Sequence, residues 1–209
     1  MSITLIIIII TAIVSFTAFS NEKIKYDLIF NGPAVKNNNQ WYRFLSCALI
    51  HADITHLLFN MFAFYSFGGL VEENFNDIFG AKGPVLFIAL YVISQILCLL
   101  PTYFKHQDDY YYNSLGASGA ISAVVFAGIF LFPLQKVGII LIPIYIPGFI
   151  FGFIYLAITV YLDRKGGGTM NHSAHFFGAV AGIMLLVIFG YIFSPYDLLQ
   201  NFISEIKSY

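Results

Sequence analysis

Charged residues are scarce in this chain. Asp, Glu, Lys and Arg make up 10% of its 209 residues, whereas a soluble domain carries about 25%. Hydrophobic residues account for 59%, and the mean hydropathy is +0.80. A chain so poor in charge cannot cover a water-facing surface, so we expect its solvent to be largely lipid. The length allows a single domain over residues 1–209 and no separate soluble module.

The sequence lacks the residues that several classes of function require. The net charge is −1 and there is no basic run, so nucleic-acid binding has no electrostatic support. Cys47 and Cys98 lack metal-ligand spacing, and we expect both to be buried and reduced. The His-Glu-x-x-His motif of metalloproteases is absent, and the spacing of His51 and His56 does not place them on one helix face. An aspartyl protease needs two intramembrane aspartates, and only Asp53 lies near an apolar segment.

Apolar runs long enough to cross a bilayer recur along the chain. A helical span needs roughly 17 to 25 residues. The runs lack the alternation of barrel strands, so an all-α membrane protein with a bundle of six transmembrane helices is expected. The predicted segments are Ile3–Phe19, Ile54–Val71, Gly83–Tyr103, Gly116–Phe132, Tyr145–Leu162 and Ser173–Phe193.

Two segments need a separate interpretation. Ala18-Phe19-Ser20 resembles a small-x-small cleavage site, so residues 1–20 could be a signal peptide. No Lys or Arg precedes this apolar run, which favours a retained helix. The stretch Lys136–Pro147 is apolar but contains Pro143 and Pro147, so we expect a turn before the fifth helix.

Polar side chains inside apolar runs are the informative ones, because a charge at mid-bilayer costs roughly 2.5–3.5 kcal/mol even on lenient scales. His56 and Asn60 are four residues apart in the second segment and share a helix face. Interhelical hydrogen bonding could account for either residue alone.

Small residues and a histidine indicate a close helix pair. Gly116-Ala117-Ser118-Gly119 opens the fourth segment, and Gly178 and Gly182 follow His175 on its side of the sixth. Small residues let helix backbones approach closely, so we expect His175 to face the helix of Ser118. A hydroxyl within reach of an imidazole is the minimum arrangement for an activated serine nucleophile.

A serine nucleophile also needs donors for the developing oxyanion. His56 and Asn60 can supply them, together with the backbone N–H of Ser118 near a helix N-terminus. No acidic residue is close to His175 in sequence, which favours a Ser–His dyad. Asp163 is the alternative third member.

Taken in order along the chain, these residues resemble the rhomboid family of intramembrane serine proteases. Each motif is weak alone, and the signal is specific because all of them fall on the right segments. The matching elements are Trp41-x-Arg43, His51-x4-His56-x3-Asn60, Gly68-Gly69-Leu70-Val71-Glu72, Gly116-x-Ser118-Gly119 and Ala174-His175-x2-Gly178.

The resemblance implies that Ser118 attacks a membrane-anchored substrate, with His175 as general base and then acid. It implies an oxyanion hole of His56, Asn60 and the Ser118 N–H.

Glu72 would tie the second helix to the first loop. The resemblance implies no cofactor and no metal; the partners would be transmembrane substrates and the lipid bilayer, in the inner (plasma) membrane of a bacterium. Further structural roles would fall to Arg43 and Trp41, which anchor the first loop, and to His51, Gly116, Gly119 and Gly178.

Three positions depart from the family pattern. Tyr42 separates the Trp and Arg of the first loop, and Asn74 stands where the family can place a basic residue. Ser122 replaces a tyrosine that stacks on the catalytic histidine in some members. We therefore expect His172 or Ser122 to orient His175.

Orientation and activity each leave an alternative. The family orientation puts both termini in the cytoplasm, whereas most Lys and Arg then lie on the other side, against the positive-inside rule. We keep the family orientation. The main functional alternative is a catalytically inactive rhomboid-like protein that binds membrane clients, although such relatives typically lack the serine or the histidine. A small transporter or channel lined by these polar groups is the other alternative.

Overall fold

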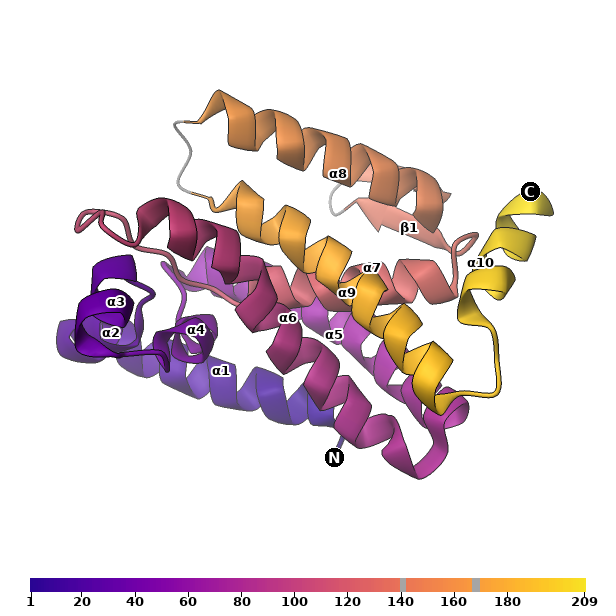
Figure 1. Ribbon diagram of the computed structural model, residues 1–209, viewed down its shortest axis with the longest axis horizontal. Coiled ribbons are helices and arrows are strands. Elements are labelled where there is room, and N and C mark those ends of the chain that lie inside the picture. Colours follow the sequence, from indigo (N-terminus) through magenta and orange to yellow (C-terminus); the bar gives the residue numbers. More distant parts are fainter. Residues whose placement is uncertain (140–141, 167–169) are drawn as a thin grey trace.

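The computed structural model describes residues 1–139, 142–166 and 170–209. Long helices dominate it, and short helices fill the first loop (Figure 1). The elements are α1 (Ile3–Ser20), α2 (Glu22–Leu28), α3 (Gly32–Asn38), α4 (Arg43–Ser46), the 3-10 helix η1 (Cys47–Leu49), α5 (Ile54–Phe79), η2 (Gly80–Lys82), α6 (Gly83–His106), α7 (Ser118–Leu131), β1 (Lys136–Ile139), β2 (Ile142–Pro147), α8 (Gly148–Lys165), α9 (His172–Phe193) and α10 (Leu198–Lys207).

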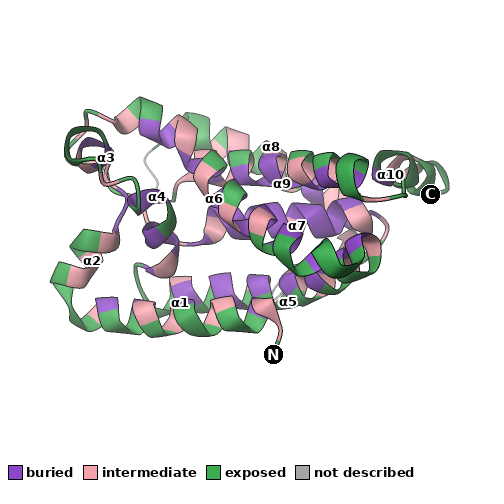
Figure 2. Ribbon diagram, turned by 60° about the horizontal axis from the view of Figure 1, so that its bottom comes forward, coloured by how far each residue is buried: buried purple, intermediate pink, exposed green. Residues whose placement is uncertain are grey.

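Helix α7 forms the centre of the bundle. It packs against α9, α6 and α5, and nearly all of its residues are buried, as Figure 2 shows. Helix α1 lies outside, against α5, and α8 lies on the other side, against α9 and α7 (Figure 1). The outer faces carry exposed apolar side chains such as Ile13 and Phe153, as expected of helices surrounded by lipid. The prediction of an all-α membrane bundle is confirmed.

Membrane crossing is supported by length and composition. Three stretches of the described residues are long and apolar enough to cross a membrane: Ile3–Ser20, Ile54–His106, which contains both α5 and α6, and His172–Phe193. Helix α7 is a shorter apolar helix. The chain is therefore an integral membrane protein, while the count of six crossings and their orientation stay predictions.

Each predicted segment contains a helix, and the ends shift for local reasons; the fifth helix begins at Gly148 and not at Tyr145, because Tyr145–Pro147 belong to β2. Helix α5 continues to Phe79 because Phe75 and Phe79 are buried in the core, which stabilises the helix although the apolar run ends near Glu72. Helix α7 begins at Ser118 because Gly116 has a φ of 108°, outside the helical region.

The stretch Lys136–Pro147 is not the simple turn that its prolines predict. Its strands β1 and β2 pair antiparallel, with Lys136 opposite Pro147 and Val137 opposite Ile146. Pro147 is the last residue of β2, where a missing N–H disturbs the strand least. β-branched residues in both strands, such as Val137 and Ile146, favour this extended conformation.

The prediction that Glu72 ties α5 to the first loop is wrong. Its carboxylate oxygens accept hydrogen bonds from the N–H of Ile3 at 2.7 Å and of Thr4 at 2.8 Å, and from the Thr4 hydroxyl at 2.7 Å. The first N–H groups of a helix lack intrahelical partners and carry partial positive charge, which favours a carboxylate there. Gly68 lies against the Thr4 side chain and leaves room for this approach. Glu72 therefore caps the N-terminus of α1.

We expect Glu72→Gln to lower the free energy of unfolding by about 2 kcal/mol, because the amide loses the charge and turns N–H groups towards N–H donors. Denaturation of the purified protein in detergent measures this effect. Glu73→Gln is the matched control, since Glu73 is the exposed neighbour. Equal stability of the two variants would contradict the capping role.

Candidate active site

The close approach of α7 and α9 brings Ser118 and His175 together. A Cβ on Gly178 would overlap the carbonyl oxygen of Gly119 and lie 2.9 Å from its carbonyl carbon. A Cβ on Gly182 would likewise overlap the carbonyl oxygen of Ala123. With the backbones this close, Nε2 of His175 lies 2.6 Å from Oγ of Ser118. The small-residue face and the histidine meet as the sequence predicts.

Gly178→Ala tests this packing. We expect the added methyl group to push α9 away from α7 and to destabilise the protein by about 1–3 kcal/mol, the usual cost of overpacking. Thermal unfolding measures the loss. Gly69→Ala on α5 is the control, because a Cβ there meets nothing within 4 Å. If Gly178→Ala were as stable as this control, the contact would not constrain the helix pair.

Ser118 is the first residue of α7 and follows a fixed turn. The N–H of Gly116 donates to the carbonyl oxygen of Cys47 at 2.9 Å. Gly116 has a positive φ, and a Cβ there would lie 2.8 Å from Cε1 of His56. The N–H of Ser118 belongs to the first helical turn, whose N–H groups have no intrahelical acceptor. It is therefore available to an anion beside the hydroxyl.

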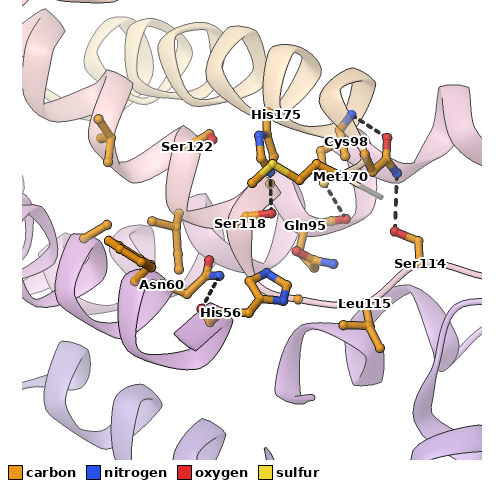
Figure 3. A pocket seen from close by; sticks show the side chains of 18 of the residues that line it. His56, Asn60, Gln95, Cys98, Ser114, Leu115, Ser118, Ser122, Met170 and His175 are labelled. Carbon is orange, nitrogen blue, oxygen red and sulfur yellow. Dashed lines mark hydrogen bonds between the residues drawn. The ribbon is translucent and has the colours of Figure 1, made fainter. Parts of the chain in front are cut away.

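His56 and Asn60 present donors to the same place. Nδ1 of His56 accepts from the N–H of Ala52 at 3.4 Å, so the proton of the neutral ring is on Nε2. Nδ2 of Asn60 donates to the carbonyl oxygen of His56 at 3.0 Å, which uses one of its two N–H groups. Figure 3 shows Ser118 between His175 on one side and His56 and Asn60 on the other.

These four side chains line one cavity of about 1270 Å³. It extends along α5 from Asp53 to Phe67, a length of about 20 Å at the helical rise per residue. Polar groups gather around Ser118, and the lining farther along the helices is mainly apolar. Exposed side chains of α5, such as Phe59, form part of its rim. The apolar part is lined by Phe67, Val125, Phe126, Val137 and Phe151, among others.

Asn171, just before α9, is a residue that the sequence reasoning missed. Its Oδ1 accepts from the N–H of Ala174 at 3.0 Å, and its Nδ2 donates to Oγ1 of Thr102 at 2.9 Å and to Oγ of Ser114 at 3.4 Å. Asn171 thus ties the helix of His175 to α6 and to the segment that leads to Ser118. An Asn directly before an apolar helix is an N-cap signal that could have identified it.

Of the two residues expected to orient His175, Ser122 pairs elsewhere and His172 lies against the ring. The Ser122 hydroxyl lies 3.2 Å from the Tyr155 hydroxyl of α8. The His172 ring does lie against His175, edge to face with centroids 6.1 Å apart. Among the described residues no carboxylate forms an ion pair with His175, so Asp163 does not complete a triad in this geometry.

The residues predicted to be structural have identifiable contacts. Arg43 is buried and donates to the carbonyl oxygens of Tyr26 at 2.9 Å and Ile29 at 2.6 Å, which holds the first loop together. Trp41 is half exposed and stacks on Phe44.

Gly119 lies against Cys98 and Ala174. His51 is buried behind His56, with ring centroids 4.9 Å apart. In the described part of the chain, no group of three or more His, Cys, Asp or Glu is arranged for a metal.

Comparison with known proteins gives a consistent result. The model of the rhomboid domain matches residues 38–192. The chain is 34% identical over 95 residues to "Putative rhomboid protease YdcA" of Bacillus subtilis, a match that covers 46% of this chain and 42% of that protein. It is 28% identical over 174 residues to "RHOMBOID-like protein 12, mitochondrial" of Arabidopsis thaliana, and this match covers 72% of this chain and 50% of that protein. It is 25% identical over 150 residues to "Rhomboid protease GlpG" of Haemophilus influenzae, and this match covers 71% of this chain and 70% of that protein. The chain thus spans about half the length or less of the first two relatives.

Proposed function

Because this chain belongs to the rhomboid family, we propose that it is an intramembrane serine endopeptidase that cleaves transmembrane segments of membrane-anchored proteins. The observation that carries the proposal is the 2.6 Å contact between Oγ of Ser118 and Nε2 of His175 inside a cavity bordered by apolar helices. An inactive client-binding protein has no need of this contact. Relatives that are named as proteases support the same function.

The chemistry proposed for the site is acyl transfer by a Ser–His dyad. Oγ of Ser118 attacks the scissile carbonyl carbon while Nε2 of His175 takes its proton. The carbonyl oxygen becomes an oxyanion, and His56, Asn60 and the N–H of Ser118 donate hydrogen bonds to it. The C–N bond breaks as His175 gives the proton to the leaving amine. A water molecule then attacks the acyl-enzyme with His175 again as base, which releases the new carboxylate and restores Ser118.

The cavity suggests how a membrane segment reaches Ser118. Its apolar part lies beside α5 and α8, and Phe59 and Phe62 on its rim are also exposed on the outer surface. An apolar substrate segment could therefore lie against the same helices that face lipid, with its scissile bond at the polar end. We propose that residues 1–209 act as one transmembrane domain. A bacterial inner membrane stays a prediction, because the relatives include bacterial and mitochondrial proteins.

The test is cleavage of a reporter transmembrane segment by the purified protein in lipid vesicles. We expect a single internal cut that persists in strong chelators, since serine chemistry needs no metal. Binding of the reporter without cleavage would favour the inactive client-binding alternative. Loss of cleavage on chelation with recovery on adding zinc would overturn the serine assignment.

A further inference from the structure

A serine of α1 contacts the histidine pair behind the candidate site. Ser15 is buried on the face of α1 that packs on the bundle. Its hydroxyl donates to the carbonyl oxygen of Leu49 at 2.9 Å and lies 3.0 Å from Nδ1 of His51. Neither Ser15 nor His51 is among the described residues that line the cavity of Ser118. Ser15 also precedes residue 38, where the match to the rhomboid domain begins.

The proton positions in this contact follow from the donors available. A hydroxyl has one hydrogen, and the Leu49 carbonyl can only accept, so the Ser15 hydrogen points to Leu49. Nδ1 of His51 must then donate to Oγ of Ser15, which places the proton of the neutral ring on Nδ1. Nε2 of His51 is buried and has no partner among the described residues. At this buried position an unpaired acceptor on Nε2 costs less free energy than an unpaired N–H donor would.

Burial, with a smaller contribution from neighbouring His56, lowers the pKa of His51 to about 3. Asp53 acts in the opposite direction and is the smallest of the three influences. His51 is therefore neutral at neutral pH, and the contact with Ser15 selects one of its two tautomers.

The His51 ring in turn packs on His56. The two rings meet edge to face, with centroids 4.9 Å apart and an interplanar angle of 72°. Both border Gly116, since a Cβ there would lie 2.8 Å from Cε1 of His56 and 3.9 Å from Cδ2 of His51. His56 is thus held between a neutral ring and the backbone before Ser118, with Nδ1 occupied by Ala52 and the Nε2 proton left for the cavity.

We propose that Ser15 is a positioning residue for the active site. It fixes His51 in the Nδ1-protonated neutral form, and His51 holds the His56 ring so that its Nε2–H can donate to the substrate's oxyanion. The inference rests on the proposed protease function, because His56 needs a fixed donor only if an oxyanion forms beside Ser118. Ser15 acts through His51 and His56 and touches no reacting atom.

Ser15→Ala and Thr11→Val form the matched pair of variants. Thr11 lies one turn earlier on the same buried face, and its hydroxyl has no partner among the described residues. Both variants remove a buried hydroxyl, but only Ser15→Ala removes the acceptor for His51. In reporter cleavage we expect Ser15→Ala to lower kcat on the order of tenfold with KM unchanged, less than the roughly 10²–10³ for removing an oxyanion donor outright, because His56 keeps its N–H and loses only its fixed position. Thr11→Val should cleave at the wild-type rate.

Nitrogen NMR of isotope-labelled histidines reads the tautomer directly and does not depend on activity. We expect His51 to show a protonated Nδ1 and an unprotonated Nε2 in the wild type, and to lose this single-tautomer signature in Ser15→Ala. A proton on Nε2 in the wild type overturns the inference, even if Ser15→Ala does not fold. So does a folded Ser15→Ala that matches Thr11→Val in kcat. Failure of the wild type to cleave would instead count against the protease function.

Discussion

Ser118→Ala is expected to abolish covalent labelling by a fluorophosphonate probe and to reduce cleavage to background. Removing the nucleophile of a serine protease costs on the order of 10⁶-fold in kcat, because no acyl-enzyme can form. The alanine variant should still fold, since the serine contributes one hydroxyl at a helix start and the packing around Gly119 is untouched. Mass spectrometry of the labelled wild type should place the adduct on Ser118.

Ser122→Ala is the matched control for this experiment. Ser122 lies one turn further along α7 and lines the same cavity, but its hydroxyl pairs with Tyr155 and not with a base. We expect the control to be labelled and to cleave. Labelling that persists in Ser118→Ala would remove Ser118 from the role of nucleophile.

Asn60→Ala is expected to slow cleavage by roughly 10²–10³, or about 2.7–4 kcal/mol, without a large change in KM. Asn60 is proposed to stabilise charge that exists only in the transition state, and His56 and a backbone N–H remain to share that task. The acyl-enzyme should therefore still form, slowly. Single-turnover cleavage and the rate of probe labelling measure the effect.

The competing role for Asn60 is a purely structural one. Its amide donates to the carbonyl oxygen of His56 one turn earlier, a bond within the first turns of α5. Asn74→Ala removes an equivalent bond from Asn74 to Leu70 near the other end of α5 and serves as the control for that contribution. If Asn60→Ala stays folded and cleaves at the wild-type rate, Asn60 is only an intrahelical hydrogen-bond donor, and the oxyanion hole must be built from His56 and backbone donors.

The sequence predicts the helices well because a bilayer demands long apolar runs, and each predicted segment contains a helix, although the fifth begins three residues later than predicted, at Gly148. The meeting of Ser118 and His175 was also predictable, since glycines on one face of a helix mark where another backbone approaches. Membership of the rhomboid family, expected from five motifs, is confirmed.

Partners that depend on three-dimensional packing could not be predicted. Glu72 lies in a motif that identifies the residue but not its partner, and Ile3 is far from it in sequence. Ser122 meets Tyr155 only because α8 packs beside α7. The pairing of β1 with β2 was hidden by the prolines of Lys136–Pro147, which indicate a turn without showing that strands flank it.

The cap that Glu72 provides has a consequence for how the protein is assembled. Helix α1 is synthesised before α5, so its free N–H groups gain their buried acceptor only when α5 has arrived. Until then the Glu72 carboxylate also lacks its hydrogen-bond donors, so each of the two helices carries polar groups without a partner. We therefore expect α1 and α5 to pair early in folding, before the rest of the bundle packs. The same pairing brings Ser15 to His51, so we expect an insertion defect in α1 to disturb the candidate active site as well, whose residues lie later in the chain.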